Sequence, residues 1–161
     1  MQLSYNMNQG VAIAGTIYDN SPRTIDSLIA EGAIGLGQGV IAGTNPQTQA
    51  KVPTATFVTG FKGVALLQAK EQNTDGTVTY VAKDTVPVLR KGRANVPFAV
   101  GYVITAETQA YLIFSGAYIG QWTSLAGYTA LTSAVAVLVA GATFINSNSS
   151  TTGGVVAIEL V

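Results

Sequence analysis

The most suggestive spacing in the chain is that of the glycines in Gly37 to Ala42, which read G-Q-G-V-I-A and match the pattern G-x-G-x-x-A of dinucleotide-binding sites. Such a site needs a helix after the glycines, because the pyrophosphate rests on the first amide groups of that helix. Here Gly43, Asn45 and Pro46 would end any helix within one turn. The next acidic residue is Glu71, too far along to bind the ribose. We therefore predict no nucleotide site, and interpret the glycines as places where a strand bends at a barrel corner or approaches a neighbouring backbone.

Other residues that could carry catalysis are absent or scattered. The chain has no His and no Cys, which removes the commonest general base, the commonest metal ligand and every thiolate site. Its eight carboxylates stand singly, without the close pair that glycosidases and divalent metal sites use. Neither S-x-x-K nor G-x-S-x-G marks a serine nucleophile. We expect no enzyme activity, no cofactor, no metal and no small-molecule substrate.

The densest charge cluster is Arg90-Lys91-Gly92-Arg93. Three positive charges give little affinity for nucleic acid at physiological salt, so a solvated turn between strands is the favoured interpretation, and contact with phosphates or an acidic partner is the alternative. Basic and acidic residues number eight each, and only 10% of residues are charged, against about 25% in ordinary soluble domains. Long-range attraction to nucleic acids or anionic lipids should be weak, and we expect neither a nucleic-acid nor a membrane partner.

One uncharged stretch, Leu125 to Ile145, has the length of a membrane span. It contains Thr, Ser and Gly, has no Lys or Arg close by to orient it, and its most apolar part, Ala134 to Ala140, covers only seven residues. We predict a strand there instead. The N-terminus lacks the basic and apolar regions of a secretory signal, so we expect no export by that route.

The rest of the chain contains short runs rich in Val, Ile, Thr, Tyr and Phe, separated by Gly, Asn, Asp or Pro. This pattern predicts an all-β fold, an antiparallel β-sandwich or barrel. We expect one β-rich domain over residues 11–161, preceded by a flexible arm over residues 1–10. The predicted strands are Val11–Tyr18, Gln38–Ala42, Gly63–Lys70, Thr77–Ala82, Val96–Thr105, Gln109–Ser115, Ser133–Ala140 and Val155–Val161.

The segment Asn20 to Gly32 has two interpretations. Ser21 could cap a helix, Pro22 suits the first helical position and Gly32 would end it, which gives one short helix near residues 22–31. The run T-I-D-S-L-I-A could equally form an extended edge strand, and both interpretations stay open.

Several aromatic residues stand in loop-like surroundings, where rigid amphipathic rings commonly anchor interfaces. The other interpretation is that these rings cap the ends of the core. Together with Met7 of the arm and the cationic cluster, they form the set of candidate interface residues: Tyr5, Met7, Tyr18, Arg90, Lys91, Arg93, Trp122 and Tyr128.

The order of these signals resembles that of the small decoration or cement proteins of tailed-bacteriophage capsids. The resemblance covers nearly the whole chain, although residues 116–129 have no counterpart and Gly35-Leu36 stands where similar proteins commonly have Pro-Phe. The segments that carry it are A-G-T-I-Y-D-N-S-P (14–22), I-D-S-L-I-A-E-G-A-I (25–34), G-Q-G-V-I-A-G (37–43), F-K-G-V-A-L (61–66), V-P-V-L-R-K-G-R-A-N-V (86–96), G-A-T-F-I-N-S (141–147) and G-G-V-V-A-I-E-L (153–160).

This resemblance implies a non-enzymatic structural protein, often a homotrimer, made in the host cytoplasm and located on the outer surface of the virion capsid. Such a protein binds the expanded head and bridges adjacent subunits of the major capsid protein, which stabilises the shell against the pressure of packaged DNA. Its partners are the major capsid protein and sister copies, against which we expect the arm to become ordered. The alternative is a virion surface module that binds a host receptor or glycan through Trp122, Tyr128 and the loop Asn146 to Gly154.

Overall fold

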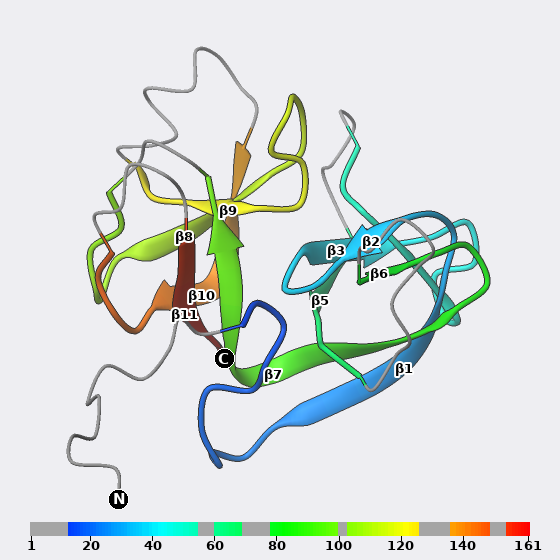
Figure 1. The fold of residues 1–161 in the computed structure, drawn as a ribbon, viewed down its shortest axis with the longest axis horizontal. Coiled ribbons are helices and arrows are strands. Elements are labelled where there is room, and N and C mark those ends of the chain that lie inside the picture. Colours follow the sequence, from blue (N-terminus) through cyan, green and yellow to red (C-terminus); the bar gives the residue numbers. More distant parts are fainter. Residues whose placement is uncertain (1–12, 55–59, 69–77, 100–102, 126–135, 149–153) are drawn as a thin grey trace, which may run out of the picture.

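The structure is a computed structural model that describes residues 13–54, 60–68, 78–99, 103–125, 136–148 and 154–161. These residues form eleven strands and confirm the predicted all-β fold (Figure 1). The strands are β1 (Thr24–Ala30), β2 (Ile34–Gly35), β3 (Gly39–Ala42), β4 (Gln49–Lys51), β5 (Phe61–Ala65), β6 (Thr79–Tyr80), β7 (Thr85–Phe98), β8 (Gln109–Ile113), β9 (Trp122–Thr123), β10 (Ala136–Phe144) and β11 (Gly154–Leu160).

Nine of the strands form two closed rings that share β7. In the first ring β1, β4, β3 and β5 follow one another, and both β1 and β5 pair with the first half of β7. In the second ring β11, β10, β8 and β9 follow one another, and both β11 and β9 pair with the second half of β7. The fold is therefore barrel-like, and Figure 1 shows β7 running from the ring at the lower right into the ring at the upper left.

Strand β7 changes rings at Lys91 and Gly92. Thr24 of β1 is the register partner of Lys91, and Leu160 of β11 is the partner of Gly92. Gly92 has a φ of 121°, which side chains disfavour, and a Cβ there would lie 2.8 Å from the Cβ of Arg23. The predicted turn at residues 90–93 is wrong, because this segment lies inside a strand of 14 residues. Its charged side chains reach solvent because the strand passes from one ring to the other there.

The ambiguous segment after Asn20 is a strand, so the predicted short helix near residues 22–31 is wrong and the extended alternative is confirmed. Leu28 and Ala30 of β1 are buried, whereas Ile25 and Ile29 are 41% and 42% exposed. The antiparallel pairing of β1 with β7 extends from Thr24 to Ile29 and outweighs the local capping signals. Ser21, the expected cap, gives its hydroxyl hydrogen bond to the carboxylate of Asp19 instead.

Trp122 lies in β9 and is fully buried, so its predicted loop-like placement is wrong. Its Nε1–H donates a hydrogen bond of 3.3 Å to the carbonyl of Gly37, and its ring meets that of Phe61 edge-on at a centroid distance of 6.0 Å. Trp122 therefore joins the second ring to the first. Its burial follows the other interpretation of the aromatic residues, in which they belong to the core.

The glycines of the G-x-G-x-x-A pattern lie where the first ring faces the second. A Cβ on Gly37 would lie 2.7 Å from the Cδ of Pro97, and one on Gly39 would overlap the side chain of Leu112. The N–H of Gly39 donates to the carbonyl of Gly120 over 2.9 Å. Strand β3, not a helix, follows these glycines, which confirms the interpretation of close backbone approach.

The uncharged stretch after Leu125 contributes β10, and the predicted strand is confirmed for its described part. Within the described ranges, no helix is long and apolar enough to span a bilayer. Of the predicted strand Val11–Tyr18 the described part forms only an isolated bridge, from Ile17 to Ala94. The arm over residues 1–10 lies outside the described residues.

Candidate functional site: the surface where β7 changes rings

Four of the eight candidate interface residues come together where β7 passes between the rings. Arg90, Lys91 and Arg93 are neighbours on the strand, and the backbone N–H of Tyr18 donates to the carbonyl of Arg93 over 3.1 Å. The side chains of Tyr18, Arg90 and Lys91 are exposed and that of Arg93 is half-buried. Trp122 lies apart in the core. Tyr5, Met7 and Tyr128 lie outside the described residues.

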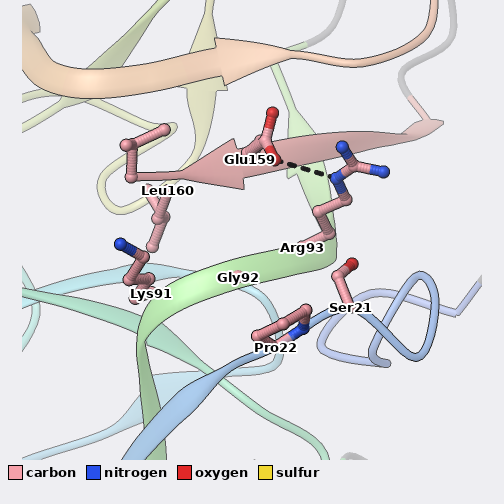
Figure 2. Close-up of a pocket in the computed structure, with 8 residues that line it drawn as sticks. Ser21, Pro22, Lys91, Gly92, Arg93, Glu159 and Leu160 are labelled. Carbon is pink, nitrogen blue, oxygen red and sulfur yellow. Dashed lines mark hydrogen bonds and ion pairs between the residues drawn. The ribbon is translucent and has the colours of Figure 1, made fainter.

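Arg93 is the centre of an ion-pair network that joins three segments of the chain. Its Nε lies 3.0 Å from Oε1 of Glu159 on β11 (Figure 2). Its Nη1 lies 3.0 Å from Oδ2 of Asp19. These two carboxylates, Glu159 foremost, raise the pKa of Arg93 above its ordinary value. The network fixes the segment before β1 to both β7 and β11.

The carboxylate of Asp19 is also held by Ser21. It accepts hydrogen bonds from the Ser21 hydroxyl and, over 2.9 Å, from the Ser21 backbone N–H. These two bonds, followed by the Arg93 guanidinium, lower the pKa of Asp19. Both hydrogen bonds join residues two positions apart, so they stabilise the local turn before β1.

A pocket of about 310 Å³ opens beside this network. In Figure 2, Ser21 and Pro22 face the bend of β7 from the segment before β1, while Arg93 points toward Glu159. The pocket combines cationic, acidic and apolar groups, an arrangement suited to holding a side chain of a partner through hydrogen bonds and ionic contacts. Its lining residues are Ser21, Pro22, Lys91, Gly92, Arg93, Glu159, Leu160 and Val161.

The cations near the pocket differ in whether they have an ion-pair partner. Arg90 lies 3.3 Å from Asp26, and this ion pair is exposed to solvent. Arg23 and Lys91 are exposed, and neither has an ion-pair partner among the residues that the structure describes. The surface therefore carries free positive charge, although the whole chain is neutral.

Sequence reasoning missed the acidic half of this surface. Asp19 and Glu159 lie 74 and 66 positions from Arg93, and each reads as an isolated surface charge. The pairing of β11 with β7 places Glu159 opposite Arg93, and the backbone hydrogen bond from Tyr18 to Arg93 brings the neighbouring Asp19 to the same place. No local motif in the sequence announces this pairing.

The described residues of the alternative receptor or glycan site have structural roles. Trp122 has no exposed surface. Asn146 accepts a hydrogen bond of 2.7 Å from the N–H of Ala157, and Asn148 donates one of 3.2 Å to the carbonyl of Val155, so both amides hold β11 in place. Across the described ranges, no group of three or more His, Cys, Asp and Glu side chains could hold a metal ion.

Comparisons with known proteins agree with the fold. No curated protein sequence matches the chain. A chain of the solved structure "The capsid of Myoviridae Phage XM1" is similar to this one, with a TM-score of 0.73, 17% sequence identity, and coverage of 99% of this chain and 98% of that chain. The family model described as "Structural cement protein (E217 gp24/Pam3 gp6)" matches residues 1–161. With the whole chain covered by that model, this protein belongs to the phage structural cement protein family.

Proposed function

We propose that the protein binds the outer surface of the expanded phage head and bridges adjacent subunits of the major capsid protein, acting as a homotrimer that stabilises the shell against the pressure of packaged DNA. The observation that carries this proposal is the match of the cement-protein family model to the entire chain. The similarity of fold to a chain of a phage capsid structure supports it.

The way in which the two rings are joined suits a clip between subunits. The two rings share β7, and the contacts of Trp122 with Gly37 and of Gly39 with Gly120 join them a second time. A rigid body that contacts two capsid subunits must lose its contacts with one of them before they separate. Contacts repeated around a trimer axis multiply this effect by avidity, provided that all three copies reach their binding sites together.

The low charge of the chain suits a protein present in many copies on one shell. Eight basic residues balance eight acidic ones, so neighbouring copies do not repel one another through net charge. Within the described residues Arg93, Arg90 and Lys51 pair with carboxylates. Contact with the capsid should therefore rest on shape, apolar area and a few local charges.

A binding experiment tests the proposal. Purified protein is mixed with undecorated expanded heads of the cognate phage or with host cells, and the amount left in solution after sedimentation is measured. We expect the protein to sediment with the heads and to remain in solution when mixed with cells. We also expect decorated heads to rupture at a higher temperature than bare heads. Removal by cells alone would favour receptor binding and overturn the proposal.

A further inference from the structure

Among the described residues, β1 of the first ring is paired along only part of one side. On one side β1 pairs with β7 from Thr24 to Ile29, but on the other side β4 reaches only Ile29 and Ala30. No strand of the described residues pairs with Thr24 to Leu28 on that second side. In Figure 1, β1 lies along the lower margin of the described fold, with β7 above it.

The hydrogen bonds of β1 show which backbone groups face this open edge. The N–H of Ala30 donates to Asp84 beside β7, and the N–H of Ile29 donates to Thr48 beside β4. Because successive residues of a strand point their backbone groups to opposite sides, Ile25 and Ser27 face the same way as Ile29, away from β7. The register agrees, since the partner of Ser27 is Pro87, which has no N–H to offer.

The surroundings of the open edge favour a partner with negative charge. Arg23 and Lys91, neither of which has an ion-pair partner among the described residues, lie at the N-terminal end of β1: Arg23 precedes Thr24, and Lys91, on β7, is the register partner of Thr24, one strand across from the open edge. The nearby carboxylates are already engaged, Asp26 by Arg90 and both Asp19 and Glu159 by Arg93. Ile25 and Ile29 add exposed apolar surface on the outer face of the strand.

We propose that the open edge of β1 is a docking edge for an extended acidic segment of the capsid protein, which adds as a strand through the backbone of Ile25 and Ser27 while its carboxylates contact Arg23 and Lys91. Strand addition uses backbone hydrogen bonds for affinity and side-chain contacts for specificity. The proposal rests on the proposed capsid-binding function and names the part of the surface that performs it.

A second copy of this chain is a poorer occupant of the edge. Residues 1–13 contain no acidic residue, so the arm of a sister copy offers no carboxylate to Arg23 or Lys91. Glu31, at the end of β1, is engaged by the N–H of Thr44 and by Lys51. Pairing β1 with the β1 of a second copy would therefore add no free carboxylate.

The test uses the full chain and two kinds of variant in sedimentation with undecorated expanded heads. Ser27→Pro removes the N–H that faces the open edge and leaves the bonds to β7 in place. The double variant Arg23→Glu/Lys91→Glu reverses the free charge. The matched control, Lys62→Glu/Lys83→Glu, makes the same change of net charge on β5 and before β7, away from the N-terminal end of β1.

We expect each β1 variant to bind heads at least about tenfold more weakly than the wild type, and the control to bind within about threefold of it. We also expect peptides covering Thr24 to Leu28 to gain protection from hydrogen exchange on heads. If Ser27→Pro fails to fold, the charge reversal of exposed side chains still decides the matter. Its circular dichroism and melting temperature should match those of the control.

The outcomes separate the docking edge from the proposed function. Wild-type binding that both β1 variants retain would overturn the docking edge and leave capsid binding intact. No wild-type binding would overturn both. Self-association of the wild type that Ser27→Pro abolishes, with head binding unchanged, would assign the edge to a second copy and overturn the acidic partner.

Discussion

Gly63 shows how closely the residues of the first ring pack. It lies in β5 with a φ of 141°, and an added Cβ would overlap the carbonyl oxygen of Leu89 on β7. Backbone cannot move aside as a flexible side chain can. Gly32 is the opposite case, because nothing lies within 4 Å of the position where its Cβ would stand.

Replacing Gly63 by Ala should therefore destabilise the protein by at least about 2 kcal/mol, which lowers the melting temperature by roughly 4–8 °C in a domain of this size. Gly32→Ala is the matched control and should change the melting temperature by less than about 2 °C. Calorimetry of both variants measures the effect. Equal melting temperatures for the two would contradict the close approach of β5 and β7.

Asp19 gives the network around Arg93 a dependence on pH. Ser21 and then Arg93 lower the pKa of Asp19 in the folded state. The interactions of its carboxylate therefore stabilise the fold fully above the unfolded pKa of about 4, and this stabilisation is lost as the pH falls through the lower folded pKa. Hydrogen bonds from Thr44, followed by the charge of Lys51, lower the pKa of Glu31 in the same way. Both groups should weaken the fold in acid.

The Asp19→Asn variant isolates this contribution. At about pH 7 it should melt below the wild type, and the difference should shrink once the pH falls below about 4, where the wild-type carboxylate becomes protonated. Melting temperatures of the two proteins across this range measure the difference. A difference that stays constant down to about pH 2 would show that the charge of Asp19 contributes nothing to stability.

Among the elements, β7 determines the architecture. Its first half closes one ring and its second half the other, so each half has a strand on both sides. Val88, Leu89, Ala94 and Val96 on this strand have no exposed surface. Opening either ring must therefore disturb the strand that holds the other.

This arrangement predicts a single unfolding unit. Amide protons of β7 should exchange only through global unfolding, and both rings should lose protection together. Native-state hydrogen exchange measures this residue by residue, with Ile29 and Ala30 of β1 as a second reporter in the first ring. Two calorimetric transitions, or faster exchange throughout one ring, would contradict a shared core.

The sequence predicts the strands that form short runs rich in Val, Ile, Thr, Tyr and Phe, and does not predict the continuous strand at the junction of the two rings. Strands β3, β5, β6, β8, β10 and β11 each overlap a predicted run, as does the end of β7. The stretch of β7 from Pro87 to Arg93 contains a proline and three charged residues, a pattern typical of a turn between strands. In the structure Pro87 occupies a position where no N–H is needed toward β1.

The candidate site was half predictable for a related reason. Cations that are neighbours in the sequence can be recognised directly, so the sequence identifies Arg90, Lys91 and Arg93 as candidates. The carboxylate partners of Arg93 come from distant parts of the chain. Trp122 is buried inside the second ring, which the sequence around it does not indicate. Long-range pairing decides both outcomes, and local patterns carry no information about it.

At the scale of the whole molecule, we expect residues beyond the described surface to take part in binding. We expect the arm over residues 1–10 to order against the capsid or a sister subunit, because it is polar and carries only isolated anchors such as Tyr5 and Met7. We expect such an arm to contribute to binding and not to the stability of the free protein.

Deleting residues 1–9 should therefore reduce occupancy of expanded heads several-fold at a limiting protein concentration, and leave the melting temperature of the free protein unchanged. Sedimentation followed by quantitative gel analysis measures the occupancy. Full occupancy by the truncated protein would show that the arm takes no part in binding.

Bridging of capsid subunits is the central claim, and a reconstruction of decorated heads by electron cryomicroscopy tests it most directly. Purified protein is added to undecorated expanded heads, and the map is compared with that of the bare heads. We predict added density on the outer surface in which each copy contacts at least two subunits of the major capsid protein. Density that contacts one subunit only, or lies on the inner surface, would contradict the account.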